Sequence, residues 1–338
     1  MSRPAREPPS PSAIVPALLR HVATTGADAA ALAIRFGLPA DASEHDEIDV
    51  PPATADELLE AASVLLGEPA LAIRLPGELS LRRYCLAELA ARSAATVRDS
   101  LAAIARYGSF VDPRFAFELV ESGPVAVWHQ RTPRHPRGVG RHSEDFVLAY
   151  VITHLRAATG HAVGPKQVWF AHARPRGIEP LHRFFATSEL AFGELSSGFE
   201  LHRALLDLRL VTGDARTFAT ATNLADAALQ ARPRTHELAP RVTAFLAGAM
   251  TATADDAARA MQMSARTLQR RLETEGTTFS EVLDGAREQL ARKLVADLDL
   301  GLADIADRVG FADLATFTRA FKRWTGSPPG QFRRSRSS

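Results

Sequence analysis

The chain has 338 residues, of which 46% are hydrophobic, and its formal net charge is +1. A chain of this length is expected to form two domains, since one domain takes roughly 150 residues. No uninterrupted apolar stretch approaches the roughly 18 residues of a membrane span. The start, residues 1–12, is rich in Pro, Ser and Arg and lacks the apolar region of a secretion signal. We therefore expect a disordered tail over residues 1–12 and a cytoplasmic location.

The cysteine and histidine content argues against metal chemistry. The single cysteine, Cys85, excludes an internal disulfide framework and a cysteine-only zinc site. It falls in a helical pattern, where we expect a buried thiol. His129, His135 and His142 lie close in sequence, but no pair of them has the i, i+4 spacing of a helical metal motif. The sequence predicts neither a metal site nor a cofactor.

The first domain is predicted to be α+β and to cover residues 13–230. Its opening, residues 13–110, repeats apolar residues at helical spacing. Alternating apolar residues then flank Glu121 to Pro124, which predicts a β-hairpin. A helix is expected over 147–155, short strands at 167–171 and 190–192, and a helical stretch ending at Gln230. Residues 231–240 are predicted to be a linker.

Residues 241–338 are predicted to be an all-α domain, and they begin with a helix-turn-helix. Thr253 and Asp256 have the spacing of a helix N-terminal cap. After a break at Gln262 and Met263, Ser264 can cap a second helix that ends before Gly276. Leu268 and Leu272 can face the first helix, and Arg266, Gln269 and Arg270 are left outward. Arginine can bind guanine and glutamine can bind adenine in the major groove.

A second helix-turn-helix follows a predicted connecting helix over 279–298. Its first helix carries Ile305 and Ala306, its turn begins at Gly310, and its second helix runs from Leu314 to Trp324. From Leu314 to the end there are six basic residues and no acidic ones. Such a basic segment suits contact with DNA phosphates.

The second half of the chain resembles the DNA-binding domain of the AraC/XylS family of bacterial regulators. The resemblance covers about Val242 to Arg334, and it is carried by Ser264 to Leu272, Ala286 to Leu294, Ile305 to Phe311, Phe317 to Trp324, Gly326, Pro328 and Phe332. It implies seven helices, with the two recognition helices in successive major-groove segments of double-stranded DNA about 34 Å apart. It also implies RNA polymerase as a partner.

The candidate DNA-binding residues come from both units. They are Ser264, Arg266, Thr267, Gln269, Arg270, Ala315, Thr316, Thr318, Arg319 and Lys322. Carried over from the family, the groove-facing positions of the second unit begin at Leu314 and Ala315, where this sequence has side chains that form no hydrogen bonds. We expect the first unit to read bases, and the second to supply thymine-methyl contacts, Arg319 and phosphate anchoring.

The first domain resembles the N-terminal domain called arabinose-binding-like, which is found in ornithine-utilisation and virulence regulators. The segments that carry this resemblance are Tyr107 to Val111, Val168 to His172, Pro180 to Phe185, Leu190 to Gly193 and Leu205 to Asp207. It covers roughly Pro16 to Gln230 and implies effector sensing or dimerisation. Phe115, Phe117, Trp128 and His154 are the candidate lining of an effector pocket. The alternative, which the sequence favours, is that they belong to the packed core.

Three hypotheses remain open at this point. The leading one is a sequence-specific transcription regulator, an activator, controlled by a small molecule or by homodimerisation. A second makes the first domain an enzyme, although the sequence shows no nucleophile elbow or phosphate-binding glycine loop, and we expect no catalytic residues. In the third, the first domain senses nothing and only dimerises or contacts a partner.

Overall fold

A computed structural model describes residues 9–79, 85–132, 139–231, 238–275, 277–295, 300–325 and 327–336. The chain divides into two compact units, which we call the N-terminal unit (within residues 6–232) and the C-terminal unit (within residues 233–338). Several predicted features lie outside the described residues: the tail through residue 8, His135, linker residues 232–237, Gly276, residues 296–298 and Gly326. Within the described chain, none of the helices has the length and apolar character needed to cross a membrane.

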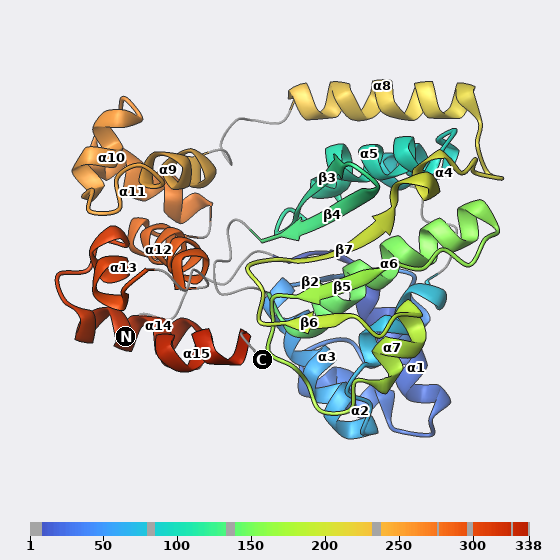
Figure 1. The fold of residues 1–338 in the computed structure, drawn as a ribbon. Helices are drawn as coiled ribbons and strands as arrows, with labels where there is room; N and C mark the ends of the chain where they lie inside the picture. The colour runs from blue at the N-terminus through green and yellow to red at the C-terminus, as the bar shows by residue number, and fades with distance from the viewer. Residues whose placement is uncertain are drawn as a thin grey trace. The chain divides into compact units, whose positions relative to one another are not determined.

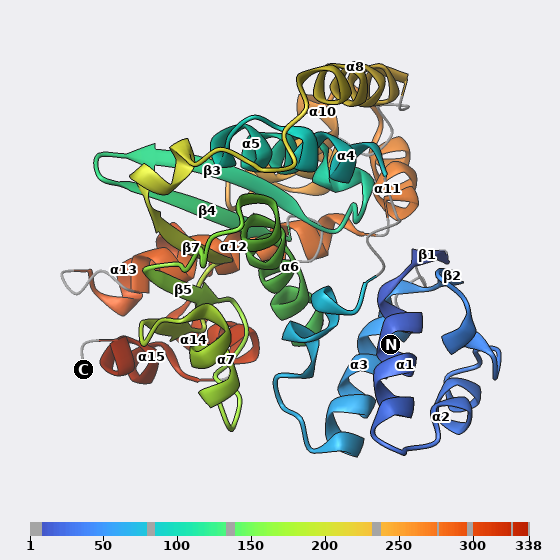
Figure 2. The ribbon, with the colours of Figure 1, turned by 90° about the vertical axis from the view of Figure 1, so that its right-hand side faces the viewer.

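The N-terminal unit opens with a small helical layer around one core. Its elements are β1 (Ser10–Ser12), α1 (Ile14–Thr24), α2 (Ala29–Arg35), β2 (Ile48–Val50) and α3 (Pro52–Leu66). Helix α1 packs against both α2 and α3 (Figure 2). The prediction of a disordered tail over residues 1–12 is wrong for its last three residues, because Ser10–Ser12 pairs antiparallel with Ile48–Val50. The pairing depends on partners 36 to 40 residues away, which no local pattern indicates.

A second layer consists of three helices with small side chains at their contacts. It contains α4 (Leu86–Ser93), α5 (Val97–Tyr107) and α8 (Ala215–Ala231), and Figure 1 shows α8 alongside the other two. Six alanines are buried in this layer, which lets the helices approach closely. Cys85 precedes α4 and is exposed. The expected buried thiol is therefore wrong, since the residue lies at a helix start and not on the packed face.

A five-stranded sheet in the order β3-β4-β7-β5-β6 completes the N-terminal unit. The strands are β3 (Ala116–Ser122), β4 (Val125–Arg131), β5 (Gln167–Phe170), β6 (Leu190–Phe192) and β7 (Ser197–His202), and the helices beside them are α6 (Arg141–Thr159) and α7 (Glu179–Phe185). The predicted hairpin is confirmed as β3 and β4, which pair antiparallel. The central strand β7 was not predicted from the sequence. It contains Gly198, where a Cβ atom would lie 2.3 Å from the carbonyl oxygen of Trp128.

The C-terminal unit contains seven helices within its described residues, in agreement with the family resemblance. They are α9 (Leu238–Leu246), α10 (Ala254–Ala260), α11 (Ala265–Thr274), α12 (Phe279–Val295), α13 (Leu302–Arg308), α14 (Leu314–Thr325) and α15 (Pro329–Arg336). One core lies under α9 to α11 and another under α13 to α15. Helix α12 contributes Val282 and Ala286 to the first core and Ala291 and Val295 to the second. This long helix thus joins two helix-turn-helix units into one body.

Candidate DNA-binding surface

The first helix-turn-helix is held by hydrogen bonds between near neighbours in sequence. The predicted cap is confirmed as a full capping box, in which Thr253 N–H donates to Asp256 Oδ2 (2.9 Å) and Asp256 N–H to Thr253 Oγ1 (3.3 Å). The hydroxyl of Thr253, which also donates to Asp256 Oδ2, is the largest cause of a pKa of Asp256 below its usual value, and the amide of Thr253 adds to it. Such a box satisfies amides that the first turn leaves without helical partners.

Its turn requires a left-handed residue, and the sequence places Gln262 there, with φ of 57°. The amide of Met263 donates to the carbonyl of Ala258 (3.0 Å), the long bond of a helix C-terminal motif. Ser264 then accepts from the amide of Thr267 (3.2 Å) and begins α11, as predicted. Leu268 and Leu272 are fully buried, so their predicted orientation is confirmed.

The second helix-turn-helix repeats this backbone pattern with different residues. Gly310 has φ of 83°, and the amide of Phe311 donates to the carbonyl of Ala306 (2.9 Å). Asp313 accepts from the amide of Thr316 (2.7 Å) at the start of α14. The pKa of Asp313 lies below its usual value, chiefly because of that backbone bond. Both recognition helices therefore begin after a turn of the same geometry.

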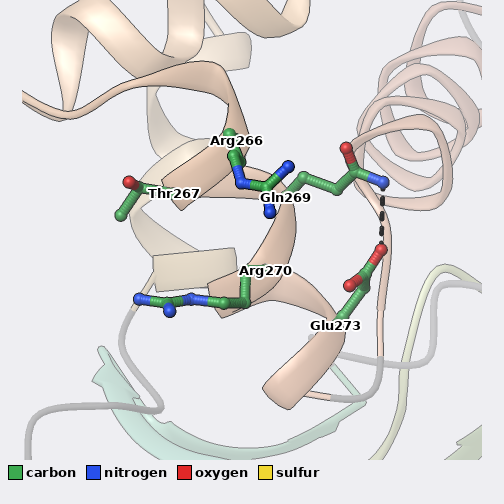
Figure 3. A pocket seen from close by; sticks show the side chains of 5 residues that line it. All are labelled: Arg266, Thr267, Gln269, Arg270 and Glu273. Carbon is green, nitrogen blue, oxygen red and sulfur yellow. Dashed lines mark hydrogen bonds between the residues drawn. The ribbon is translucent and has the colours of Figure 1, made fainter.

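The outward face of α11 is polar and exposed. Arg266, Gln269 and Arg270 are exposed, and Thr267 is half-buried. With Glu273 they line a shallow depression of about 360 Å³ (Figure 3). Glu273 was absent from the sequence-based candidates, although its position one turn beyond Gln269 could have indicated it. This face offers guanidinium donors together with amide and carboxylate acceptors.

The outward face of α14 is more apolar at its start. Leu314 is 41% exposed and Ala315 is also exposed, whereas Thr316 and Thr318 are half-buried. The hydroxyl of Thr316 donates to Asp313 Oδ2 (2.9 Å) and accepts from Arg319 Nη2 (3.0 Å). The chain of bonds from the helix cap therefore holds the Arg319 side chain along α14.

Further along α14, Lys322 is exposed and carries an ammonium group to the same solvent side of the helix as Arg319. The ring of Phe321 between them is fully buried. A lysine at this place is suited to a phosphate, which it binds as a point charge.

Arg287 of α12 connects the two helix-turn-helix units. Its Nε and Nη2 atoms donate to the carbonyl of Met250 (3.2 and 2.8 Å), and Nη2 also donates to the carbonyl of Gly310 (2.9 Å). Its guanidinium lies over the ring of Phe311, 5.0 Å from the centroid. One side chain thus ties the segment before α10 to the second turn. Sequence reasoning assigned Arg287 no such role, because its partners are far away in sequence.

A buried carboxylate secures the start of the first unit. Glu275 accepts from the amides of Leu238 and Ala239, both at 2.9 Å, where α9 begins. Because these amides are buried, they would lack partners without this carboxylate. Glu275 therefore fixes α9 against the end of recognition helix α11.

The four candidate effector residues belong to the packed part of the N-terminal unit, where Phe115 and Trp128 are buried and Phe117 and His154 are half-buried. Phe115, Phe117 and Trp128 form a continuous ring stack with centroid distances of 6.1 and 5.4 Å. His154 Nε2 lies 2.9 Å from Ser100 Oγ, between α6 and α5. Two surface depressions, one on α11 and one around α7, contain none of these four residues. Trp128 is fully buried, so a ligand reaches it only by displacing neighbouring side chains.

Comparison with known proteins gives two matches to family profiles. The profile described as the arabinose-binding domain of AraC transcription regulator, N-terminal, matches residues 26–210. The profile described as a helix-turn-helix domain matches residues 257–335, which include both turns described above.

Individual relatives match over most of their length. The ornithine utilization regulator of Pseudomonas aeruginosa is 25% identical over 282 residues, 82% of each chain. The HTH-type transcriptional regulator VirS of Mycobacterium tuberculosis is 26% identical over 327 residues, 91% of each chain. The crystal structure of transcriptional regulator CdpR from Pseudomonas aeruginosa is 22% identical, with a TM-score of 0.45 over 94% of this chain and 96% of that one.

Proposed function

Because this chain belongs to the AraC family of transcription regulators and carries its helix-turn-helix domain, we propose that it binds specific sites on double-stranded DNA through α11 and α14. The observation that carries the proposal is the pair of matched turns at Gln262 and Gly310, each followed by a capped helix with an exposed outer face. We further propose that it acts in the cytoplasm as an activator that contacts RNA polymerase.

The two recognition helices have different tasks in this proposal. Arg266, Gln269 and Arg270 of α11 read base edges, because their side chains are exposed and carry the donors and acceptors that distinguish base pairs. Ser264 and Thr267, at the N-terminal end of α11, contact the backbone of the DNA, where hydroxyl groups and helix N-termini bind phosphate oxygens.

Helix α14 mainly positions the protein. Ala315 and the neighbouring Leu314 suit thymine methyl groups, Thr316, Thr318 and Lys322 suit phosphates, and Arg319 supplies one base contact. Because phosphate contacts carry no sequence information of their own, the second half of the binding site is expected to be the less selective one.

The N-terminal unit is the proposed sensing or dimerisation domain. The linker predicted over residues 231–240 is too long at both ends, because α8 continues to Ala231 and α9 begins at Leu238. Support for it is the match to the arabinose-binding family, whose name assigns no effector to this chain. The aromatic stack of Phe115, Phe117 and Trp128 is the proposed place of effector action, by displacement of packed rings. A unit that only dimerises remains the alternative, and titration of candidate metabolites against the intrinsic tryptophan fluorescence separates the two.

An enzymatic role for the N-terminal unit is disfavoured by the place of its serine–histidine contact. Ser100 and His154 are within hydrogen-bond distance, as a nucleophile and its base would be. However, Ser100 is fully buried between α5 and α6. A substrate has no access to this hydroxyl in the packed unit.

The test is selection of bound sequences from a random DNA pool by the full-length protein at near-physiological salt. We expect a motif with two elements about one helical turn apart. Arg270→Ala should weaken binding to the preferred site by about 1–3 kcal/mol and relax the preference at one position. Arg271→Ala, which removes the same charge from an exposed position outside the depression on α11, is the matched control. A uniform loss for Arg270→Ala would make it a phosphate contact, and the absence of any motif would refute sequence-specific binding.

A further inference from the structure

Gln269 and Glu273 form a hydrogen-bonded pair on the outer face of α11. Gln269 Nε2 donates to Glu273 Oε1 at 3.0 Å, across one helical turn. Figure 3 shows this pair on one side of the helix, while Arg270 extends to the opposite side with Thr267. Arg266 lies between these two sides, with its guanidinium toward Gln269, so the depression has a carboxylate at one side and arginines in its middle and at its other side.

A carboxylate on this face has a restricted set of DNA partners. It repels phosphates, so it is unsuited to backbone contact. It carries only acceptors when ionised, so it can bind only base-edge groups that donate. In the major groove the base-edge donors are cytosine N4 and adenine N6. Adenine also presents its N7 acceptor beside that amino group, and guanine presents two acceptors, so cytosine is the base best suited to a carboxylate. Glu273 can therefore accept a hydrogen bond from cytosine, and its contact with guanine would be repulsive.

The hydrogen bond from Gln269 orders the carboxylate for this task. Gln269 Nε2 donates to Oε1, and within the described residues the second carboxylate oxygen, Oε2, forms no hydrogen bond, while the Glu273 side chain is exposed in the lining of the depression. An exposed glutamate loses side-chain freedom when it binds a base, and a partner that already restricts it reduces that loss. The same bond adds little to the stability of the helix, as is usual for exposed pairs at this spacing.

We propose that Glu273 is a specificity-determining residue, which accepts a hydrogen bond from the N4 amino group of a cytosine and is held for it by Gln269. The inference rests on the proposed sequence-specific binding by α11. It assigns the arginine side chains of the depression to guanine and the Glu273 carboxylate to cytosine. The first element of the operator should therefore contain both bases within the reach of one recognition helix.

The test compares the full-length protein with Glu273→Gln, which keeps the shape of the side chain and removes its charge. Binding is measured for the selected operator and for its single-base-pair variants. Glu273→Gln should lower the preference for cytosine over adenine at one position by about 5- to 10-fold, because glutamine can also bind adenine. Gln269→Ala should lower the same preference by a smaller factor, since the carboxylate remains but is less ordered, and it should also relax the preference at the base that Gln269 itself contacts.

The matched control is Asp255→Asn, which removes one negative charge from the exposed surface of α10 in the same unit. It should raise affinity for all sequences alike and leave every base preference unchanged. If Glu273→Gln behaves in the same way, Glu273 is only a surface charge and the inference is refuted. If the unaltered protein shows no base preference at all, the proposed function fails, and this inference fails with it.

Discussion

Substitution of Gly310 by alanine tests whether the second turn depends on a close backbone approach. Gly310 has φ of 83°, and a Cβ atom there would lie 2.7 Å from the carbonyl oxygen of Met250. That oxygen cannot move away freely, because Arg287 donates to it from Nε and Nη2. The substitution therefore strains the turn and loosens the bridge between the two helix-turn-helix units.

The expected cost follows from three contributions. The left-handed conformation costs alanine about 1–2 kcal/mol, of which about 0.4–1 kcal/mol is recovered because alanine has less freedom than glycine in the unfolded chain. A loosened hydrogen bond to a charged group costs about 1.5–3 kcal/mol. Gly310→Ala should therefore destabilise the C-terminal unit by about 2–4 kcal/mol.

Hydrogen–deuterium exchange of the full-length protein can assign this loss to the C-terminal unit. Peptides from residues 238–336 should exchange at least about 30-fold faster at amides that need the unit to unfold, since 1.4 kcal/mol is about a factor of ten. Gly248→Ala is the matched control, because a Cβ there would meet only the carbonyl oxygen of Phe245, at 3.9 Å. Equal protection in the two variants would refute the argument from Gly310.

Two further predictions concern buried polar groups. Glu275→Gln replaces one carboxylate oxygen facing the buried amides of Leu238 and Ala239 with an amide donor. The C-terminal unit should lose about 1–3 kcal/mol of stability. Hydrogen–deuterium exchange should become faster in α9, and unchanged protection there would contradict the prediction. Burial lowers the pKa of His154 to about 4. Between pH 6.5 and 4 the unfolded chain therefore binds a proton at this histidine and the folded chain does not. The free energy of unfolding should fall with decreasing pH in that window by about 1.4 kcal/mol per pH unit. Denaturant unfolding at several pH values should show a shallower fall for His154→Gln, and an unchanged slope would show that His154 does not contribute.

The sequence alone determined where the helices and turns of the two helix-turn-helix units begin. Thr253 with Asp256, Ser264 and Gly310 indicated where helices begin and turns occur, and the structure confirms each of these positions. Such signals are readable because capping and turn residues bond within three or four positions along the chain. The β3–β4 hairpin was predicted for the same reason, since its two strands pair across a short turn.

Only the tertiary structure decided the features that join distant segments. Strand β7 pairs with β4 and β5, yet it contains Gly198 and only two apolar residues that alternate with polar ones, Phe199 and Leu201, which is too short a pattern to predict a strand. Arg287 bonds to residues 37 and 23 positions away, and Glu275 bonds to amides 37 and 36 positions away. No local spacing marks such partners, because they become neighbours only when separate helices pack.

The same division applies to the recognition surface. The exposed positions of α11 followed from helical spacing once Leu268 and Leu272 were assigned to the core. The pairing of Gln269 with Glu273 did not follow, because a helix surface allows several side-chain arrangements of similar energy and the fold selects one. The sequence by itself therefore determined which residues of α11 face outward, and the structure decided that Gln269 and Glu273 form a hydrogen-bonded pair among them.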